Sequence, residues 1–328
     1  MFSRNSLVIT HERAIKNNFQ HSTLIFDEDP IDKILEINEM FISDLQVLIS
    51  RLRLPGNQDL NNLLENLKSS EPNVVIKTPD LTSYIDQVKG QIKNFNIPLS
   101  NIPMFLASSY YIKDSMDKDK IYYIKKNDLS TTKKIIILSA TITPLFYQHL
   151  YGDRVHVFDL GEVENTGKVL QYTRRSCSRD SLSKYVTKLA EEVGESIVIT
   201  FKDYSKYFQN GQEDIYFGNC SGYDTLANKN LTVVGTPHLK NIKYFLFANI
   251  LGINYTNDDT EMSYQWIEHN GFRFKFNTFF HEGLRIIQLF LIESEIIQAV
   301  GRARTLRYNC TVSLYSNFPL KQSSEFIF

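Results

Sequence analysis

Residues 295–304, with the sequence EIIQAVGRAR, combine an apolar helical lead-in with a glutamine, a glycine and two closely spaced arginines. The arginine guanidinium is always charged, and its planar fork of donors matches phosphate oxygens. Two such groups at the end of a helix indicate a site that grips a polyphosphate. The alternative is a solvated basic helix end, whose arginines only complement the negative end of the helix dipole.

Outward from this stretch, the second half of the chain alternates apolar runs with amphipathic segments. An amphipathic helix is predicted at Leu182–Val193, and alternating residues from Trp266 to Phe280 predict a hairpin that turns at Asn270-Gly271. Strands are predicted at Ser196–Phe201, Asp214–Phe217, Leu231–Val234 and Thr311–Tyr315. Strands that alternate with helices predict a parallel sheet, with functional loops after the carboxyl ends of the strands.

In the first half, a strand predicted at Ser22–Phe26 ends in Asp27-Glu28-Asp29-Pro30. Three carboxylates this close repel one another, so something must compensate their charge. One interpretation is an exposed acidic turn that caps a helix beginning at Ile31. The other is a divalent cation, bound through one or two carboxylates together with substrate phosphates, as magnesium prefers.

The segment that follows, residues 31–125, is predicted to be mostly helical and is interpreted as a packed insertion or lid. Within it, residues 32–54 place apolar side chains at helical spacing, which predicts one helix. Next, Ile135–Leu138 is a continuous apolar run that predicts a fully buried strand, and it ends in Ser139-Ala140-Thr141. Residues 153–179 lack strong periodicity and are interpreted as a crossing between two domains.

Composition limits the classes of protein that the chain can belong to. Its 328 residues suffice for two domains, and 42% hydrophobic residues exclude general disorder. The net charge of -1 means that a nucleic-acid surface must be a local patch. Three cysteines without a CxxC pair argue against zinc, iron–sulfur and disulfide frameworks. Without a long apolar run or a signal core, we expect a soluble protein without a membrane partner, in the cytoplasm, in an organelle or encoded by a phage.

Taken in order, the polar clusters resemble the motifs of superfamily 2 helicases of the DEAD/DEAH type. Asp27-Glu28-Asp29-Pro30 resembles the Walker B box, and Ser139-Ala140-Thr141 resembles the SAT motif that ends the first RecA-like domain. Ile197–Lys202 resembles the strand and turn that open the second domain, and residues 218–224 and 234–238 stand where motif V and its neighbour belong. Gln298-x-x-Gly301-Arg302-x-Arg304 resembles motif VI, which carries the arginine finger.

The resemblance implies an α/β fold with two RecA-like parallel-sheet domains, the first incomplete, and a helical insertion. Residues 1–30 would hold the partial first domain with the Walker B box, and residues 31–125 the insertion. Residues 126–150 would end the first domain with the SAT motif, and residues 151–328 would form the second domain.

The resemblance also implies roles for individual residues, with ATP and Mg²⁺ as cofactors. Asp27 would hold Mg²⁺ on the nucleotide phosphates, and Glu28 would orient or deprotonate the attacking water. Arg302 and Arg304 would reach the γ-phosphate, with Gly301 beside them and Gln298 facing the nucleotide or the domain interface. Ser139, Ala140 and Thr141 would couple the nucleotide to nucleic acid. Contacts to nucleic acid would come from His11, Lys202, Gly235, Thr236 and His238, although for His238 alone a structural role is the stronger interpretation.

The sequence departs from the family pattern in three places. The acidic box continues with Asp29-Pro30, and motif VI reads GRAR, so that Arg304 or Arg307 is the second finger. The sequence has no GxxxxGK[ST] phosphate loop, the Walker A motif that cradles nucleotide phosphates. We therefore expect a Walker A segment missing from these residues to be needed for turnover, supplied upstream or by a separate polypeptide.

Three functions remain open at the level of sequence. The first is the C-terminal portion of an ATP-dependent nucleic-acid helicase or translocase, acting on DNA in replication or repair, with RNA as a further possible substrate. The second is a catalytically inactive helicase relic that binds nucleic acid or regulates. The third is a metal-dependent nuclease built on the acidic cluster, which the lack of a second carboxylate or histidine group at a matching strand end disfavours.

Overall fold

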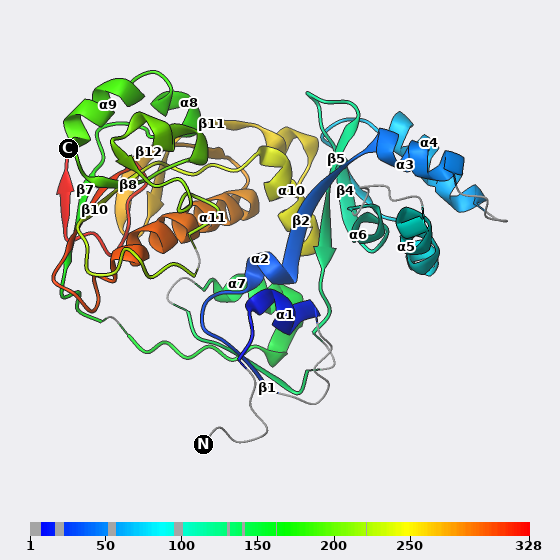
Figure 1. Ribbon diagram of the computed structural model, residues 1–328, viewed down its shortest axis with the longest axis horizontal. Coiled ribbons are helices and arrows are strands. Elements are labelled where there is room, and N and C mark those ends of the chain that lie inside the picture. Colours follow the sequence, from blue (N-terminus) through cyan, green and yellow to red (C-terminus); the bar gives the residue numbers. More distant parts are fainter. Residues whose placement is uncertain are drawn as a thin grey trace. The chain divides into compact units, whose positions relative to one another are not determined.

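The computed structural model describes residues 8–16, 23–51, 57–94, 101–129, 132–139, 142–161, 163–220 and 222–328. The chain divides into two compact units, each described here by itself. Unit 1 comprises Met1–Leu150 and Lys240–Asn254, and unit 2 comprises Tyr151–Leu239 and Tyr255–Phe328. The structure confirms a mixed α/β fold that contains parallel sheets (Figure 1).

Within its described residues, unit 1 contains helices, one 2-stranded sheet, one 4-stranded sheet and a 3₁₀ turn. Its helices are α1 (His11–Lys16), α2 (Ile31–Ile34), α3 (Ile42–Arg51), α4 (Gln58–Ser69), α5 (Ile85–Asn94), α6 (Asn101–Leu106), α7 (Pro144–Tyr151) and α10 (Asn241–Ile250), with η1 (Thr82–Tyr84) as the 3₁₀ turn. Its strands are β1 (Thr23–Phe26), β2 (Leu35–Phe41), β3 (Val75–Lys77), β4 (Tyr110–Lys113), β5 (Lys120–Lys126) and β6 (Lys134–Ile137).

The insertion is built around an antiparallel sheet of order β2-β5-β4-β3. Helices α3 to α6 contribute apolar side chains to one core with this sheet, including Leu45, Leu63 and Phe105, which are at most 1% exposed. Helix α10 contacts β4 and β5, although it lies more than one hundred residues later in the chain. The insertion is therefore a mixed α/β element with its own hydrophobic core.

The prediction of one helix across residues 32–54 is wrong for Leu35–Phe41, which form strand β2. Seven consecutive residues of β2 pair in antiparallel register with β5, from Leu35 opposite Lys126 to Phe41 opposite Lys120. Helical and strand spacing both suit the short apolar pattern here. Pairing with a strand some eighty residues away in the chain decided between them, which no local pattern can reveal.

Strands β1 and β6 form a parallel two-stranded sheet, with Phe26 opposite Ile137. The predicted strand at residues 135–138 is therefore present, but the prediction that it is fully buried is wrong. Its residues are half-buried, and the neighbouring Ile25 and Leu138 are 63% and 54% exposed. Continuous apolar runs are typical of parallel strands covered on both faces. Among the described residues, β6 pairs with β1 alone.

Unit 2 is organised around a six-stranded parallel sheet of order β14-β7-β13-β10-β8-β9. The strands are β7 (Lys168–Tyr172), β8 (Ile197–Ile199), β9 (Asn210–Gly211), β10 (Leu231–Val234), β13 (Thr311–Tyr315) and β14 (Glu325–Ile327), beside the hairpin β11 (Met262–His269) and β12 (Phe272–Phe279). The helices are α8 (Arg179–Leu182), α9 (Val186–Val193) and α11 (Glu282–Val300), with the 3₁₀ turns η2 (Gly152–Arg154), η3 (Lys202–Tyr207), η4 (Asn257–Thr260) and η5 (Gly301–Ala303).

The strands predicted near residues 196–201, 231–234 and 311–315 are confirmed as β8, β10 and β13. The predicted strand at Asp214–Phe217 is wrong, because β9 occupies the sheet edge beside β8 and the later segment forms bends. Its apolar side chain Ile215 is nevertheless buried in the core of unit 2. Burial alone had produced the strand-like pattern.

Strand β7 was not predicted, since residues 153–179 had been interpreted as a crossing between domains. Its inward positions are Val169 and a glutamine, Gln171, both at most 1% exposed. The amide of Gln171 donates to the carbonyls of Ser316 and Phe318 at 3.0 and 2.6 Å, and its oxygen accepts from Leu320 N–H at 3.1 Å. A polar residue at a core position interrupts the apolar alternation, which concealed the strand.

The predicted hairpin is confirmed, with Asn270 and Gly271 at φ values of 54° and 78°. Both values fit the two-residue turn that favours an Asn-Gly pair.

Among the described residues, no helix combines the length and apolarity needed to span a bilayer.

Candidate functional site

The structure brings the acidic box and the first residue of the SAT-like turn to the same edge of one sheet. Because β1 and β6 are parallel and in register, both of their carboxyl ends lie at that edge. The Leu138 N–H donates to the Phe26 carbonyl at 2.9 Å, so Asp27 and Ser139 directly follow two hydrogen-bonded neighbours. Ala140 and Thr141 lie outside the described residues. Asp27 is exposed, whereas Glu28 and Ser139 are half-buried.

Asp29, the third carboxylate, is held inside unit 1. Its Oδ1 accepts from the Ile31 N–H at 3.0 Å and from the Tyr147 hydroxyl, so it caps the start of α2. Burial raises the pKa of Asp29, and these two hydrogen bonds oppose the rise. Its Oδ2 is buried and has no hydrogen-bond partner within the described segments. The interpretation of the acidic turn as the cap of a helix at Ile31 is thus met by Asp29, while Asp27 stays exposed to solvent.

The chemistry of Asp27 fits a magnesium ion that takes most of its ligands from phosphates and water. Mg²⁺ is commonly held by one or two carboxylates and completes its octahedron with phosphate oxygens and water. Across the described residues, no group of three or more His, Cys, Asp or Glu side chains is arranged to hold a metal ion.

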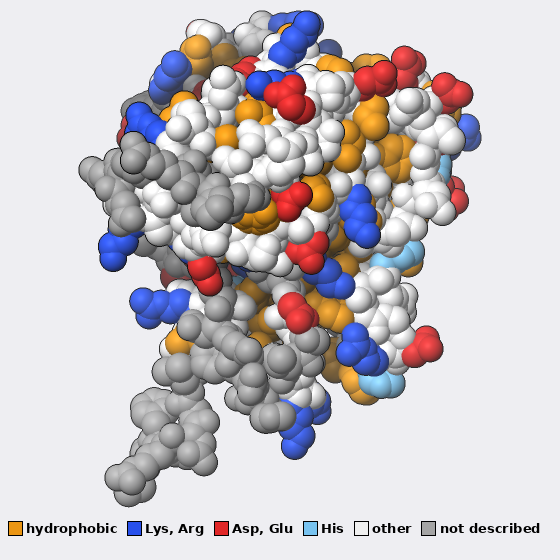
Figure 2. All heavy atoms as spheres, turned by 90° about the vertical axis from the view of Figure 1, so that its right-hand side faces the viewer, with side chains coloured by type: hydrophobic (Ala, Val, Ile, Leu, Met, Phe, Trp, Pro, Cys, Tyr) orange, Lys and Arg blue, Asp and Glu red, His pale blue; other side chains and the backbone are white. Residues whose placement is uncertain are grey.

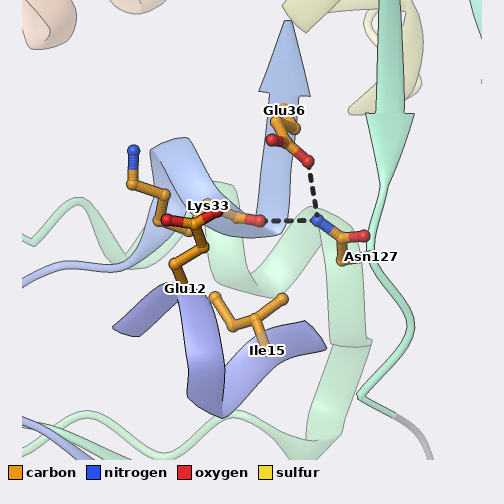
Figure 3. A pocket seen from close by; sticks show the side chains of 5 residues that line it. All are labelled: Glu12, Ile15, Lys33, Glu36 and Asn127. Atoms are coloured by element: carbon orange, nitrogen blue, oxygen red, sulfur yellow. Dashed lines mark hydrogen bonds between the residues drawn. The ribbon is translucent and has the colours of Figure 1, made fainter. Parts of the chain in front are cut away.

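His11 lies at the start of α1, with its ring edge-on to Phe26 at a centroid distance of 5.3 Å. Beside α1 is a small cavity, shown in Figure 3, where Asn127 donates to the Lys33 carbonyl at 2.8 Å and to Glu36 at 3.4 Å. The cavity holds about 10 Å³, which is close to the minimum for one water molecule. It is too small for a nucleotide.

The GRAR stretch forms a tight turn at the end of α11. Arg302 is 4% exposed, and its guanidinium donates to the carbonyls of Tyr223 and Gln298 at 3.0 and 3.2 Å. The Arg304 side chain is 35% exposed and donates to Asp224 at 2.6 Å. That hydrogen bond lowers the pKa of the Asp224 carboxyl. The two arginines therefore differ, since one is tied to backbone carbonyls and the other pairs with an exposed carboxylate.

Arg304 also has an unusual backbone. Its φ and ψ are 59° and 46°, in the left-handed region that a non-glycine residue rarely adopts. Such residues cluster at functional sites, where the surrounding structure holds them in place. Gly301, by contrast, has a helical backbone, and a Cβ built there meets no atom within 4 Å, so packing within the described residues does not require glycine.

A second group of predicted residues gathers at the carboxyl edge of the parallel sheet in unit 2. Gly235 directly follows β10, has a φ of 155°, and could not carry a Cβ without meeting Phe217 Cε2 at 2.3 Å. Thr236 is fully buried, and its hydroxyl bonds to the Ser316 hydroxyl at 2.8 Å and to Asn317 Oδ1 at 3.0 Å. Internal packing and hydrogen bonding therefore account for both residues.

His238 and Lys202 occupy the same edge in different ways. The His238 ring stacks on Phe276 at 5.1 Å and lies 3.3 Å from the Gln288 amide, and burial lowers its pKa to about 4. Lys202 follows β8, is exposed, and carries its ammonium 5.4 Å from the centre of the Tyr216 ring. Lys202 is thus the member of this group whose charge faces solvent.

Unit 2 also has a group of basic residues that the sequence analysis did not assign to a site. A surface hollow of about 470 Å³ is lined by Arg175, Ser176, Ser181, Lys184, Tyr185 and Lys188. Arg175 pairs with Glu192 at 2.9 Å on its rim. The spacing of Lys184 and Lys188, four residues apart around the start of α9, was the available sequence signal. On the face drawn in Figure 2, by contrast, basic side chains are interspersed with acidic ones.

The two groups in unit 2 lie at opposite edges of its sheet. The Asn228 N–H donates to the Ala303 carbonyl at 3.1 Å, which places the GRAR turn beside the loop that enters β10. Gly235 and His238 follow the other end of the same strand. The structure therefore brings together the arginines with residues 223–228, and separately Lys202 with residues 235–238.

No protein-family model matches the chain, and no curated protein matches it. Among solved structures, it is similar to one named XPD helicase, at 13% identity and a TM-score of 0.49, over 90% of this chain and 64% of that one. A second, named XPD apo, matches at 13% identity and a TM-score of 0.47, over 90% of this chain and 72% of that one. The chain thus spans about two thirds of the length of these proteins.

Proposed function

We propose that the chain is part of an ATP-dependent helicase or translocase that acts on nucleic acid, with DNA as the first expectation and RNA as the alternative. The observation that carries the proposal is the placement of Asp27, Glu28 and Ser139 at the carboxyl ends of two adjacent parallel strands. In parallel α/β sheets, ligand chemistry gathers at this edge. A Walker B box and an SAT motif acting on one nucleotide must lie side by side at the same edge of a sheet, as these residues do.

In this proposal Asp27 holds Mg²⁺ on the nucleotide phosphates, and the ion neutralises negative charge on them. Glu28 orients the attacking water or takes its proton, for which its half-buried position next to Asp27 is suited. Ser139, with Ala140 and Thr141, transmits the state of the nucleotide to the nucleic-acid contacts. Turnover needs a phosphate loop supplied by another segment or polypeptide, because none of the 328 residues forms a GxxxxGK[ST] motif.

For the arginine finger, Arg304 is the better candidate of the two. Its side chain is 35% exposed, its partner is an exposed carboxylate, and its left-handed backbone is an outlier of the kind found at functional sites. Arg302 would hold the turn through Tyr223 and Gln298, with Gly301 preceding it. An arginine finger increases the rate of nucleotide hydrolysis by about 10³–10⁵.

For nucleic acid, Lys202 and His11 remain the proposed backbone contacts, with Gly235, Thr236 and His238 shaping the edge beside Lys202. A lysine ammonium neutralises one phosphate and releases counterions, so Lys202→Ala should reduce the salt dependence of binding by about one unit of slope. The basic hollow around Arg175 and Lys188 is a further surface of matching charge.

The experiment that tests this function is DNA-stimulated ATP hydrolysis, measured for this chain alone and together with a polypeptide that carries the phosphate loop. Activity that appears only in the completed protein, and disappears in Asp27→Ala and Arg304→Ala, supports the proposal. Hydrolysis absent from the completed protein, or unchanged in Asp27→Ala, overturns it.

The second candidate is a nucleic-acid-binding protein without ATP hydrolysis. It is favoured by one observation, the engagement of the Arg302 guanidinium with carbonyls of its own unit. Under this alternative, the completed protein binds DNA but hydrolyses no ATP, and Asp27→Ala leaves binding unchanged.

A further inference from the structure

The hairpin of unit 2 is an amphipathic ribbon with a buried and an exposed face. Residues opposite each other in β11 and β12 lie on the same face, and successive pairs alternate between faces. The pairs Gln265–Phe276 and Ile267–Phe274 face the protein. Phe276 and Ile267, at 1% and 7% exposure, belong to the core that α11 completes. The inner face is therefore fully used in folding.

The outer face carries aromatic and basic side chains side by side. Its three pairs are Tyr264–Asn277, Trp266–Lys275 and Glu268–Arg273. Tyr264 and Trp266 are 58% and 63% exposed, and Lys275 and Arg273 are exposed as well. The Arg273 guanidinium lies 5.6 Å from the centre of the Trp266 ring. Exposed aromatic rings do not contribute the free energy of burial that such large side chains provide in a core. Stability therefore does not explain their presence on this face.

The chemistry of this face matches a single-stranded nucleic acid. Base stacking on aromatic rings, flanked by cations that neutralise phosphates, is the shared device of proteins that bind single strands. Glu268 is the acidic member of the three outer pairs and lies opposite Arg273, while Lys275 lies opposite Trp266 and adds a second exposed positive charge to the face. An apolar protein partner would cover these cations without pairing their charges, which is unfavourable.

The spacing of the two rings supports the same ligand. Tyr264 and Trp266 are two residues apart on one strand, which places their Cα atoms about 7 Å apart. Bases in a duplex rise about 3.4 Å per step along each strand. The two backbone positions are thus about two duplex steps apart, a spacing that suits side chains stacking on bases spread along an extended single strand.

We propose that the outer face of the β11–β12 hairpin is a stacking platform for single-stranded nucleic acid, with Tyr264 and Trp266 as the rings and Arg273 and Lys275 as the phosphate contacts. The inference rests on the proposed nucleic-acid function but needs neither ATP hydrolysis nor the phosphate loop. It assigns a binding surface to residues outside every motif identified in the sequence.

Trp266 is the single tryptophan of the chain, so its fluorescence reports on this face alone. Titration of the full chain with an oligothymidylate should quench Trp266 emission saturably, and the same titration with a blunt duplex should quench it much less. In a binding assay with labelled oligothymidylate, Trp266→Ala and Tyr264→Ala should each weaken binding by about 5- to 150-fold. Trp266→Phe, which keeps a ring, should retain most of the affinity.

The matched control is Phe158→Ala, which removes an exposed aromatic ring of unit 2 outside the hairpin, 84% exposed. It should bind like the wild type. Lys275→Gln should lower the salt dependence of binding by about one unit of slope. Thermal unfolding of each variant separates loss of binding from loss of the fold.

Three outcomes overturn the platform, and they bear differently on the proposed function. If the chain binds oligothymidylate while Trp266 emission and the affinities of the hairpin variants stay unchanged, the platform is wrong and nucleic-acid binding stands. If the chain binds no oligonucleotide, both are wrong. If emission instead depends on protein concentration and Trp266→Ala dissociates a dimer, the face is an interface between two copies.

Discussion

Replacing Gly235 with alanine tests whether glycine is required at this position by the packing of unit 2 or by contact with nucleic acid. Its φ of 155° belongs to a region that is nearly reserved for glycine and costs about 1–3 kcal/mol for other residues. The added Cβ would lie 2.3 Å from Phe217 Cε2 and 3.2 Å from Phe201 Cε2. Moving these rings in a packed core costs a further 1–3 kcal/mol or so. We therefore expect Gly235→Ala to lower the free energy of unfolding by about 2–6 kcal/mol.

The assay is urea unfolding of the whole chain, with the transition of unit 2 followed by the emission of Trp266, its single tryptophan, and by circular dichroism. Gly194→Ala is the matched control, because Gly194 has a φ of 62° but its Cβ would meet no atom within 4 Å. It should show the backbone strain without the steric overlap. In a Phe217→Ala background, Gly235→Ala should become less costly by the overlap contribution, about 1–3 kcal/mol.

The opposite result would refute the packing argument. A Gly235→Ala protein with wild-type stability and weakened oligonucleotide binding would show that the glycine serves the nucleic-acid contact expected from sequence. Equal costs in the presence and absence of the Phe217 ring would show that steric overlap is not the cause.

Three further predictions follow from individual side chains. Burial lowers the pKa of His238 to about 4, below its unfolded value of about 6.5, so the neutral ring stabilises the fold above pH 6.5 or so and this contribution is lost as the pH falls towards 4. Urea unfolding at a series of pH values should show a decrease of up to about 3 kcal/mol, which His238→Gln flattens. Arg302→Ala leaves two part-buried carbonyls without a charged donor and should cost about 2–4 kcal/mol in thermal unfolding, while Arg304→Ala, whose ion pair is exposed, should leave stability close to wild type. Gln171→Leu keeps a similar side-chain volume but removes the hydrogen bonds of a fully buried amide. The free energy of unfolding should therefore fall by about 3–5 kcal/mol. A loss below about 1 kcal/mol would contradict the assigned hydrogen-bond network.

The sequence alone predicted those elements whose local residue pattern favours the same structure that the tertiary fold imposes. The apolar runs that became β8 and β10 are short, rich in β-branched residues, and bounded by helix and turn signals, so strand and parallel sheet could be read directly. The Asn270-Gly271 pair predicted its hairpin because few other residues adopt the two positive φ values of that turn. The acidic box and the SAT-like turn were each predicted to follow an apolar strand, and β1 and β6 do precede them; that the two strands are neighbours came from the structure.

Tertiary structure alone decided what depends on partners far away in the chain. Leu35–Phe41 became a strand because β5 pairs with it, and β7 was concealed because Gln171 finds its hydrogen bonds in residues 316–323. The same reason separates Arg302 from Arg304, two residues apart in one motif. The path of the turn directs one guanidinium to backbone carbonyls of unit 2 and the other to an exposed carboxylate. Which face of the hairpin stays in water is likewise set by the packing of α11, and that choice left Trp266 exposed.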